Sequence, residues 1–145
     1  MASGLYLPTF EDVLDTTQLA LDLDREDHKF ALYNSTRASA ADFNANTAYG
    51  TTNEISGTGY TAGGKVVTGT AFSRPGAGVM KYSSDAVSWP SSTLTGVAFV
   101  DLYADALAGD NLIEGIDLGT TYNTAAGTLL LTPHANGLFT IDFTP

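Results

Sequence analysis

The chain has 145 residues, 43% of them hydrophobic, which is enough for one domain with a buried core and excludes a disordered protein. It contains no cysteine, and this excludes disulfides, thiolate metal sites and cysteine nucleophiles. Sixteen acidic residues against six basic ones give a formal net charge of -10. Such a charge disfavours nucleic acid or an anionic membrane surface as the partner.

The start of the chain, Met-Ala-Ser-Gly-Leu-Tyr-Leu-Pro, lacks the basic region and the long apolar region of a signal peptide. Apolar runs elsewhere are a few residues long, whereas a membrane-spanning helix needs about 18 or more. We therefore expect a soluble protein that is made in the cytoplasm and needs no membrane.

Residues 1–27 form an N-terminal arm with a pattern of its own. Thr9 follows Pro8 and precedes acidic Asp12, which predicts a short helix with Thr9 as its cap. Leucines alternate with other residues over 19–24, which predicts an extended edge strand. The apolar residues before it are our candidate partner-binding set: Leu5, Tyr6, Leu7, Phe10, Val13 and Leu14. The competing interpretation is that they cover an open edge of the protein's own sheet.

The remainder of the chain is strand-like. Seven short runs rich in β-branched and aromatic residues are predicted strands: 28–34, 65–72, 78–82, 97–105, 111–118, 127–132 and 138–143. Several short strands separated by turn signals are typical of an all-β protein. The sequence therefore predicts a single domain over 1–145, an antiparallel β-sandwich or partial barrel that carries the N-terminal arm.

Two β-hairpins are expected. The first joins 97–105 to 111–118 through the turn Ala108-Gly109-Asp110. The second spans 127–143, because Asn136-Gly137 is a strong signal for a two-residue hairpin turn. In its last strand Phe139, Ile141 and Phe143 alternate with other residues, which predicts that these three side chains belong to the core.

A long polar, glycine-rich stretch occupies 38–64. Loops longer than about 12–15 residues in a compact domain are usually functional or mobile. This one carries apolar side chains at scattered positions, so we expect it to pack against the β body: Phe43, Tyr49, Ile55 and Tyr60.

Several motifs resemble binding sites without the residues that the chemistry requires. The run 59–65 has the glycine and lysine spacing of a phosphate-binding loop, but Val66 follows where Ser or Thr is needed, so we interpret it as coincidence. The alternating acids of 22–26 lack the later residues of an EF-hand, which leaves an irregular calcium site open. The last 64 residues hold seven acids and no base, which predicts a solvated acidic face or, alternatively, an acidic contact surface or divalent-ion site. Asn34-Ser35-Thr36 matches a glycosylation sequon by pattern alone.

No catalytic constellation is visible. Only His28 and His134 could act as bases near neutral pH, and neither lies in a recognisable catalytic motif. We expect no enzymatic activity, no catalytic residue, no cofactor and no metal. Trp89 is expected to be a core or edge aromatic. The tyrosines leave a carbohydrate-binding face open as an alternative: Tyr6, Tyr33, Tyr49, Tyr60, Tyr82, Tyr103 and Tyr122.

Six segments follow one another in a recognisable order: "SGLYLPTFEDVL", "LDLDREDHKFALYNST", "DFNANTAYGTTNEISGTGYTAGGKVVTG", "DAVSWPSSTLTGVAFVDLYAD", "NLIEGIDLG" and "GTLLLTPHANGLFTIDF". In this order, and across nearly its whole length, the sequence resembles small virion proteins of tailed bacteriophages. These motifs are glycine turns and core apolar residues, so no functional residue can be carried over from the family.

The resemblance implies a non-enzymatic structural protein of the virion, assembled in the host cytoplasm. The first hypothesis is a head decoration or cement protein that binds the major capsid protein or another virion protein, as a trimer or other homo-oligomer. The alternative is a minor tail component that binds a receptor or glycan.

Overall fold

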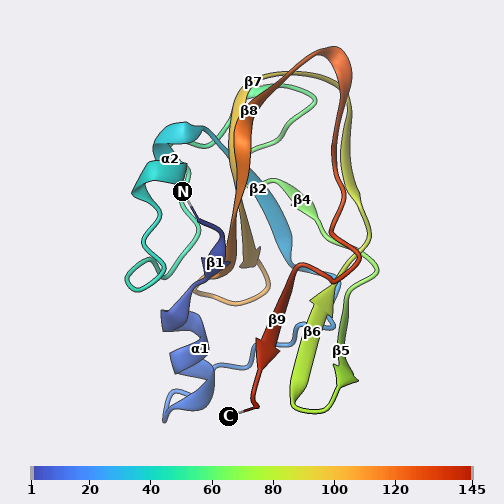
Figure 1. Ribbon diagram of the computed structural model, residues 1–145. Helices are drawn as coiled ribbons and strands as arrows, with labels where there is room; N and C mark the ends of the chain where they lie inside the picture. Colours follow the sequence, from blue (N-terminus) through green and yellow to red (C-terminus); the bar gives the residue numbers. More distant parts are fainter. Residues whose placement is uncertain (1, 145) are drawn as a thin grey trace.

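The computed structural model describes residues 2–144, so the first residue of the predicted arm and the last residue of the chain lie outside it. Figure 1 shows the elements in chain order. These are β1 (Gly4–Leu5), α1 (Leu7–Leu14), β2 (Lys29–Tyr33), α2 (Ser35–Ala40), β3 (Gly57–Thr58), β4 (Lys65–Val66), β5 (Ala71–Gly76), β6 (Val79–Ser83), β7 (Val87–Ala104), β8 (Asn111–Leu131) and β9 (Phe139–Asp142).

The strands form two antiparallel sheets. The large sheet has the order β1-β8-β7-β2-β4, with β3 also paired to β7, and the small sheet has the order β5-β6-β9. Strands make up 48% and helices 10%, and the described strands do not close into a barrel. The predicted all-β, sandwich-like fold class is therefore confirmed.

The predicted hairpin between β7 and β8 is confirmed and is much longer than expected. The two strands stay paired from Ala104 and Asn111 at the turn to Val87 and Leu131 at the far ends. Figure 1 shows the pair rising from the turn, bending over at the top and descending toward the small sheet. Four shifts of register between Trp89 and Phe99 accompany the bend, as expected because β-bulges kink and twist a strand.

Each face of the large sheet carries its own core. On the face toward the small sheet, Phe30, Val100 and Leu102 pack with Tyr82 of β6. The returning ends of β7 and β8 add Trp89 and Leu129 to the same cluster, so Trp89 is a core aromatic, as predicted. The opposite face has a second core under the N-terminal segment, α2 and the long loop: Tyr6, Ala31, Tyr33, Ala38, Phe99, Tyr103 and Leu112.

The long loop packs against this second core, as predicted. Tyr49 stacks on Tyr103 with ring centroids 4.5 Å apart, and Phe43 lies 5.0 Å from the Tyr6 ring. Gly115 permits this close packing, because a Cβ there would lie 2.8 Å from the Phe43 ring. The loop begins with α2, whose first backbone amides donate to the Asn34 side chain, so the sequon residue caps a helix.

The predicted hairpin over 127–143 is wrong. Asn136-Gly137 does form a tight turn, in which the Gly137 amide donates to the His134 carbonyl. The strand after the turn, β9, pairs with β6 of the small sheet and not with β8. This strand is only half-covered there, so Ile141 is partly buried and Phe143 is 64% exposed, and the prediction that Phe143 is a core residue is wrong.

Two details of the N-terminal arm also differ from the prediction. Helix α1 begins at Leu7, and Thr9 is buried inside it, where its hydroxyl donates to the Leu112 carbonyl at 2.5 Å instead of capping the helix. The leucine-rich stretch 19–24 contains no strand. It crosses between α1 and β2 as an irregular segment, with Leu23 buried in the first core.

Candidate docking surface

The first residues of the arm are part of the fold. Gly4 and Leu5 pair with Gly115 and Glu114 of β8, and the Tyr6 amide donates to the Ile113 carbonyl. Tyr6 is 0% exposed, so it contacts its own chain and is not available to a partner. The competing interpretation, a cover over the protein's own sheet, therefore describes this part of the arm.

The Tyr6 hydroxyl enters a buried polar network. It donates to the Asp101 carboxylate at 2.6 Å, and Arg37 donates from Nε to the same carboxylate at 3.0 Å. Arg37 also donates to Asn46 in the long loop at 2.8 Å. Burial raises the pKa of Asp101, while the donors from Tyr6 and Arg37 oppose that rise. The network fixes the arm, α2 and the loop to β7, which is a structural role.

The outer side of α1 behaves differently. Leu7 is 55% exposed and Leu14 is 84% exposed, while Phe10 and Val13 are half-buried. Together with Leu5 these residues form one wall of an apolar groove of about 530 Å³. We call it the α1 groove. Five of the six candidate partner-binding residues thus line one recess.

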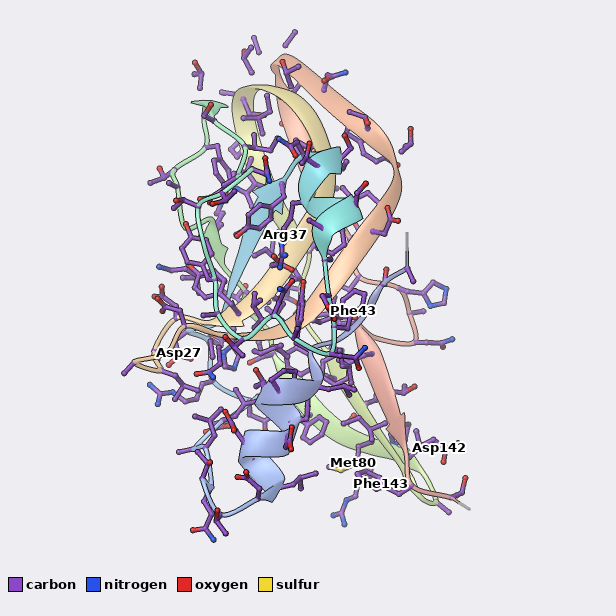
Figure 2. The ribbon with its side chains drawn as sticks, turned by 90° about the vertical axis from the view of Figure 1, so that its left-hand side faces the viewer. Asp27, Arg37, Phe43, Met80, Asp142 and Phe143 are labelled. Atoms are coloured by element: carbon purple, nitrogen blue, oxygen red, sulfur yellow. The ribbon has the colours of Figure 1, made fainter. Side chains whose placement is uncertain are left out.

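The opposite wall of the α1 groove comes from the small sheet. Phe72 of β5, Met80 of β6 and Ile141 of β9 line it, with Phe143 just beyond β9. Figure 2 shows Met80 and Phe143 close together at the lower end of the molecule, beside α1. Sequence reasoning did not identify this wall, because its residues come from three separate strands.

The border of the groove is acidic. Asp22 and Asp24 are the only charged residues among those that line it within the described chain. Asp142, at the end of β9, is the chain neighbour of Phe143, which lines the groove. An exposed apolar recess with an acidic border is the pattern of a protein interaction site, and it favours a partner that carries basic residues.

The acids of 22–26 also hold the backbone in place. Asp24 accepts a hydrogen bond from the Phe72 amide at 2.5 Å, and Glu26 accepts one from the Gly69 amide at 2.6 Å. They therefore tie the arm to β5 and to the loop that precedes it. Within residues 2–144, no group of three or more His, Asp or Glu side chains is placed to hold a metal ion.

The tyrosines do not form an exposed carbohydrate-binding face. Four are fully buried, and Tyr49 and Tyr60 are partly buried and both donate to the Glu54 carboxylate, at 2.7 and 2.6 Å. Only Tyr122, 45% exposed, remains accessible. The six other tyrosines therefore pack inside the protein, and all of them except Tyr82 also make internal hydrogen bonds through their hydroxyls.

The residues that resembled a phosphate-binding loop have structural roles. Gly64 has a φ of +77° and lies so close to β2 that a Cβ would overlap the Phe30 carbonyl oxygen. Lys65 donates to the Ser88 carbonyl at 2.7 Å. His134 is exposed in its turn, as expected, whereas His28 is buried and its Nε2 lies 2.7 Å from the Asp22 carbonyl oxygen.

Neither helix in the described range 2–144 is long and apolar enough to cross a membrane. Comparison with family models, curated proteins and solved structures finds no match to this chain.

Proposed function

We propose that this protein is a non-enzymatic structural module that docks onto a larger protein assembly through the α1 groove. The observation that carries the proposal is the concentration of exposed apolar side chains there. Leu7, Leu14 and Phe143 all line the groove, and each is more than half exposed. Monomeric soluble proteins rarely leave such a contiguous apolar surface open unless it binds something.

The form of docking that the sequence resemblance favours is decoration of a tailed-phage head. In that role the protein is a cement subunit, the partner is the major capsid protein or another virion protein, and many copies attach to a symmetric lattice. Repeated attachment supplies stability by mass action, which suits a protein without cysteine. The residues proposed for contact are Leu5, Leu7, Phe10, Val13 and Leu14 on the α1 wall, with Phe143 opposite.

The chemistry of the groove defines the matching surface on the partner. Apolar side chains should fill the recess, because burial of each contributes roughly 1.5–3 kcal/mol. Lys or Arg residues should flank them, opposite Asp22 and Asp24. A second copy of this chain is a poor match, since it would bring the same acidic border against itself.

The test is binding to capsid shells assembled from the major capsid protein of the same phage genome. Shells and purified protein are sedimented together, and the bound copies are counted per shell. The proposal expects a stoichiometry set by the lattice, and a large loss of binding for Leu14→Ser and for Leu7→Ser. Leu130→Ser is the matched control, because Leu130 is also an exposed leucine, at 57%, but lies on β8 outside the groove.

Equal binding by the Leu14→Ser and Leu130→Ser proteins would refute docking through the groove. Absence of binding to shells, together with specific signals on a glycan array, would instead favour the alternative of a tail-associated receptor- or glycan-binding module. Sedimentation of the free protein also reports whether it is a trimer or other homo-oligomer before it meets the shell.

A further inference from the structure

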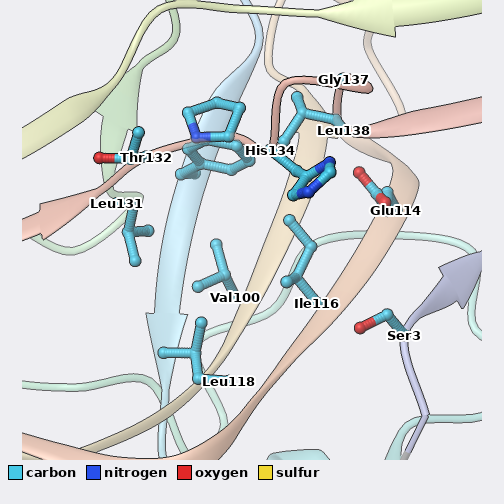
Figure 3. Close-up of a pocket in the computed structure, with 12 residues that line it drawn as sticks. Ser3, Val100, Glu114, Ile116, Leu118, Leu131, Thr132, His134, Gly137 and Leu138 are labelled. Atoms are coloured by element: carbon cyan, nitrogen blue, oxygen red, sulfur yellow. The ribbon is translucent and has the colours of Figure 1, made fainter.

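A second recess, separate from the α1 groove, lies between the large sheet and the segment that leads from β8 to β9. Its volume is about 230 Å³. Phe30, Val100, Ile116 and Leu118 supply an apolar lining from the large sheet. In Figure 3 the polar residues Ser3, Glu114 and His134 lie toward one side of the recess, and Leu118 and Leu131 toward the other.

Glu114 is the unusual member of this lining. It is 4% exposed, and its Oε2 atom has no hydrogen-bond partner among the described residues. It faces the core on the same side of the large sheet as its cross-strand neighbour Leu102. A buried carboxyl without a partner costs several kcal/mol when it is charged, so Glu114 either keeps its proton or is matched by a positive group.

Burial raises the pKa of Glu114 to about 8. Near neutral pH the carboxyl can therefore hold its proton or release it, depending on what lies beside it. A positive charge in the recess would shift the balance toward the carboxylate, because an opposite charge nearby favours the ionised form.

The lining selects among the possible ligands. An anion would be repelled by Glu114 and by the net charge of -10. A divalent metal ion needs several oxygen ligands, whereas Glu114 is the only carboxyl among the described residues that line this recess, and no group of three or more His, Asp or Glu side chains within residues 2–144 is placed to hold a metal ion. A primary ammonium group on a short alkyl chain matches both features, since the ammonium donates to Glu114 and the chain packs on the apolar lining.

We propose that the Glu114 recess is a binding site for an alkylammonium group, with the carboxylate of Glu114 as its ion-pair partner and Val100, Ile116 and Leu118 around its alkyl chain. The group could belong to a free amine or to the lysine side chain of a docked protein. A free amine and a lysine side chain present the same ammonium group and alkyl chain. They differ in the size of the molecule that has to reach the recess.

The experiment is a titration of the full-length protein at pH 8, followed by NMR of the methyl groups of Val100, Ile116 and Leu118. The probes are n-butylammonium chloride, n-butanol and sodium butyrate at matched ionic strength. We expect n-butylammonium to shift the methyl signals saturably, with half-saturation at a concentration at least tenfold below that of n-butanol. Butyrate should cause no shift. A blocked peptide with one lysine shows whether the entrance admits a protein side chain or only a free amine.

Glu114→Gln tests the ion pair, since glutamine has the shape of a protonated glutamate and should preserve the fold. It should weaken n-butylammonium binding at least tenfold and leave any n-butanol binding unchanged. Equal binding of n-butylammonium and n-butanol to the natural protein would overturn the proposal, and that comparison does not depend on any variant. Undiminished n-butylammonium binding by the Gln variant would overturn it as well.

Discussion

Arg37 and Asp101 form a buried ion pair, 3.0 Å apart, that joins α2 to the central strand β7. Asp101 is 1% exposed, so loss of its partner would leave a charge in the core. We predict that Arg37→Met lowers the free energy of unfolding by about 3–5 kcal/mol, the usual cost of breaking such a pair from one side. Urea unfolding followed by tryptophan fluorescence measures this, because Trp89 is the single tryptophan of the chain and lies in the core.

Arg25→Met is the matched control for the loss of an arginine. Arg25 pairs with Asp27 at 2.6 Å, but its side chain is 59% exposed. Exposed pairs contribute about 0–1 kcal/mol, so this variant should unfold almost like the natural protein. If the free energy of unfolding falls by the same small amount in both arginine variants, the Arg37 network does not hold α2 and the arm to the sheet.

Glu114 makes stability depend on pH. Its pKa is about 8 in the folded protein and 4.5 in the unfolded chain. Between these values the folded state holds a proton that the unfolded state has released, so the free energy of unfolding falls as pH rises, by about 1.4 kcal/mol per pH unit. Below pH 4.5 both states are protonated and this effect is absent. We predict that Glu114→Gln removes this slope and is more stable than the natural protein at pH 8.

The measurement is a series of urea unfolding curves from pH 4 to pH 9. Glu11→Gln is the control for the removal of one carboxyl, since Glu11 is exposed on α1. Parallel pH profiles for the natural protein and the Glu114→Gln variant would show that Glu114 is not the group responsible.

Removal of the hydroxyl of Tyr82 and removal of that of Tyr60 should have different effects on stability. The Tyr82 hydroxyl has no hydrogen-bond partner among the described residues, and its side chain is fully buried. Tyr82→Phe should therefore be neutral or stabilising. The Tyr60 hydroxyl donates to Glu54 and accepts from the Leu32 amide, so Tyr60→Phe should cost about 1–3 kcal/mol. Thermal unfolding measures the stability of both variants. If Tyr82→Phe lost as much stability as Tyr60→Phe, the Tyr82 hydroxyl would have a hydrogen-bond partner after all.

The sequence predicts best where pairing is local. The hairpin of β7 and β8 follows from two apolar runs, rich in β-branched and aromatic residues, on either side of the turn Ala108-Gly109-Asp110. The sequence also predicts the turn at Asn136-Gly137, but a turn motif determines only the local backbone geometry and not which strand the following residues pair with. The strand after it pairs with β6, more than fifty residues earlier, and no local pattern encodes that choice.

Only the α1 wall of the groove could be predicted from the sequence, because only its residues are close together in the chain. The apolar residues of α1 are adjacent in the chain and stand out as a cluster. Met80 and Phe143 face them only because the small sheet folds against the arm.

The Glu114 recess was not predicted, although the sequence contains a signal for it. Glu114 is the one charged residue in the run Leu112-Ile113-Glu114-Gly115-Ile116, whose apolar members predict a buried strand.

The N-terminal arm is part of the fold and also forms one wall of the α1 groove, so its deletion cannot separate the structural role from the proposed docking role. Removal of residues 1–17 takes away buried Tyr6 and Thr9, the pairing of β1 with β8, and the hydroxyl that donates to Asp101. Burial of one aromatic side chain contributes roughly 1.5–3 kcal/mol, and a core acceptor left without its donor adds about 1–3 kcal/mol. We predict that the truncated chain loses at least about 3 kcal/mol and tends to aggregate.

Docking is therefore tested by comparing the truncated chain with the full-length Leu14→Ser variant, which keeps the core contacts of the arm. Leu14 is the most exposed of the large apolar residues that the structure describes, and a substitution there should change stability by less than about 0.5 kcal/mol. Circular dichroism and thermal unfolding of both proteins check the prediction. A truncated chain that unfolds cooperatively at the natural temperature would mean that Tyr6 adds little to the core, and the whole arm would then be free to serve as a docking segment.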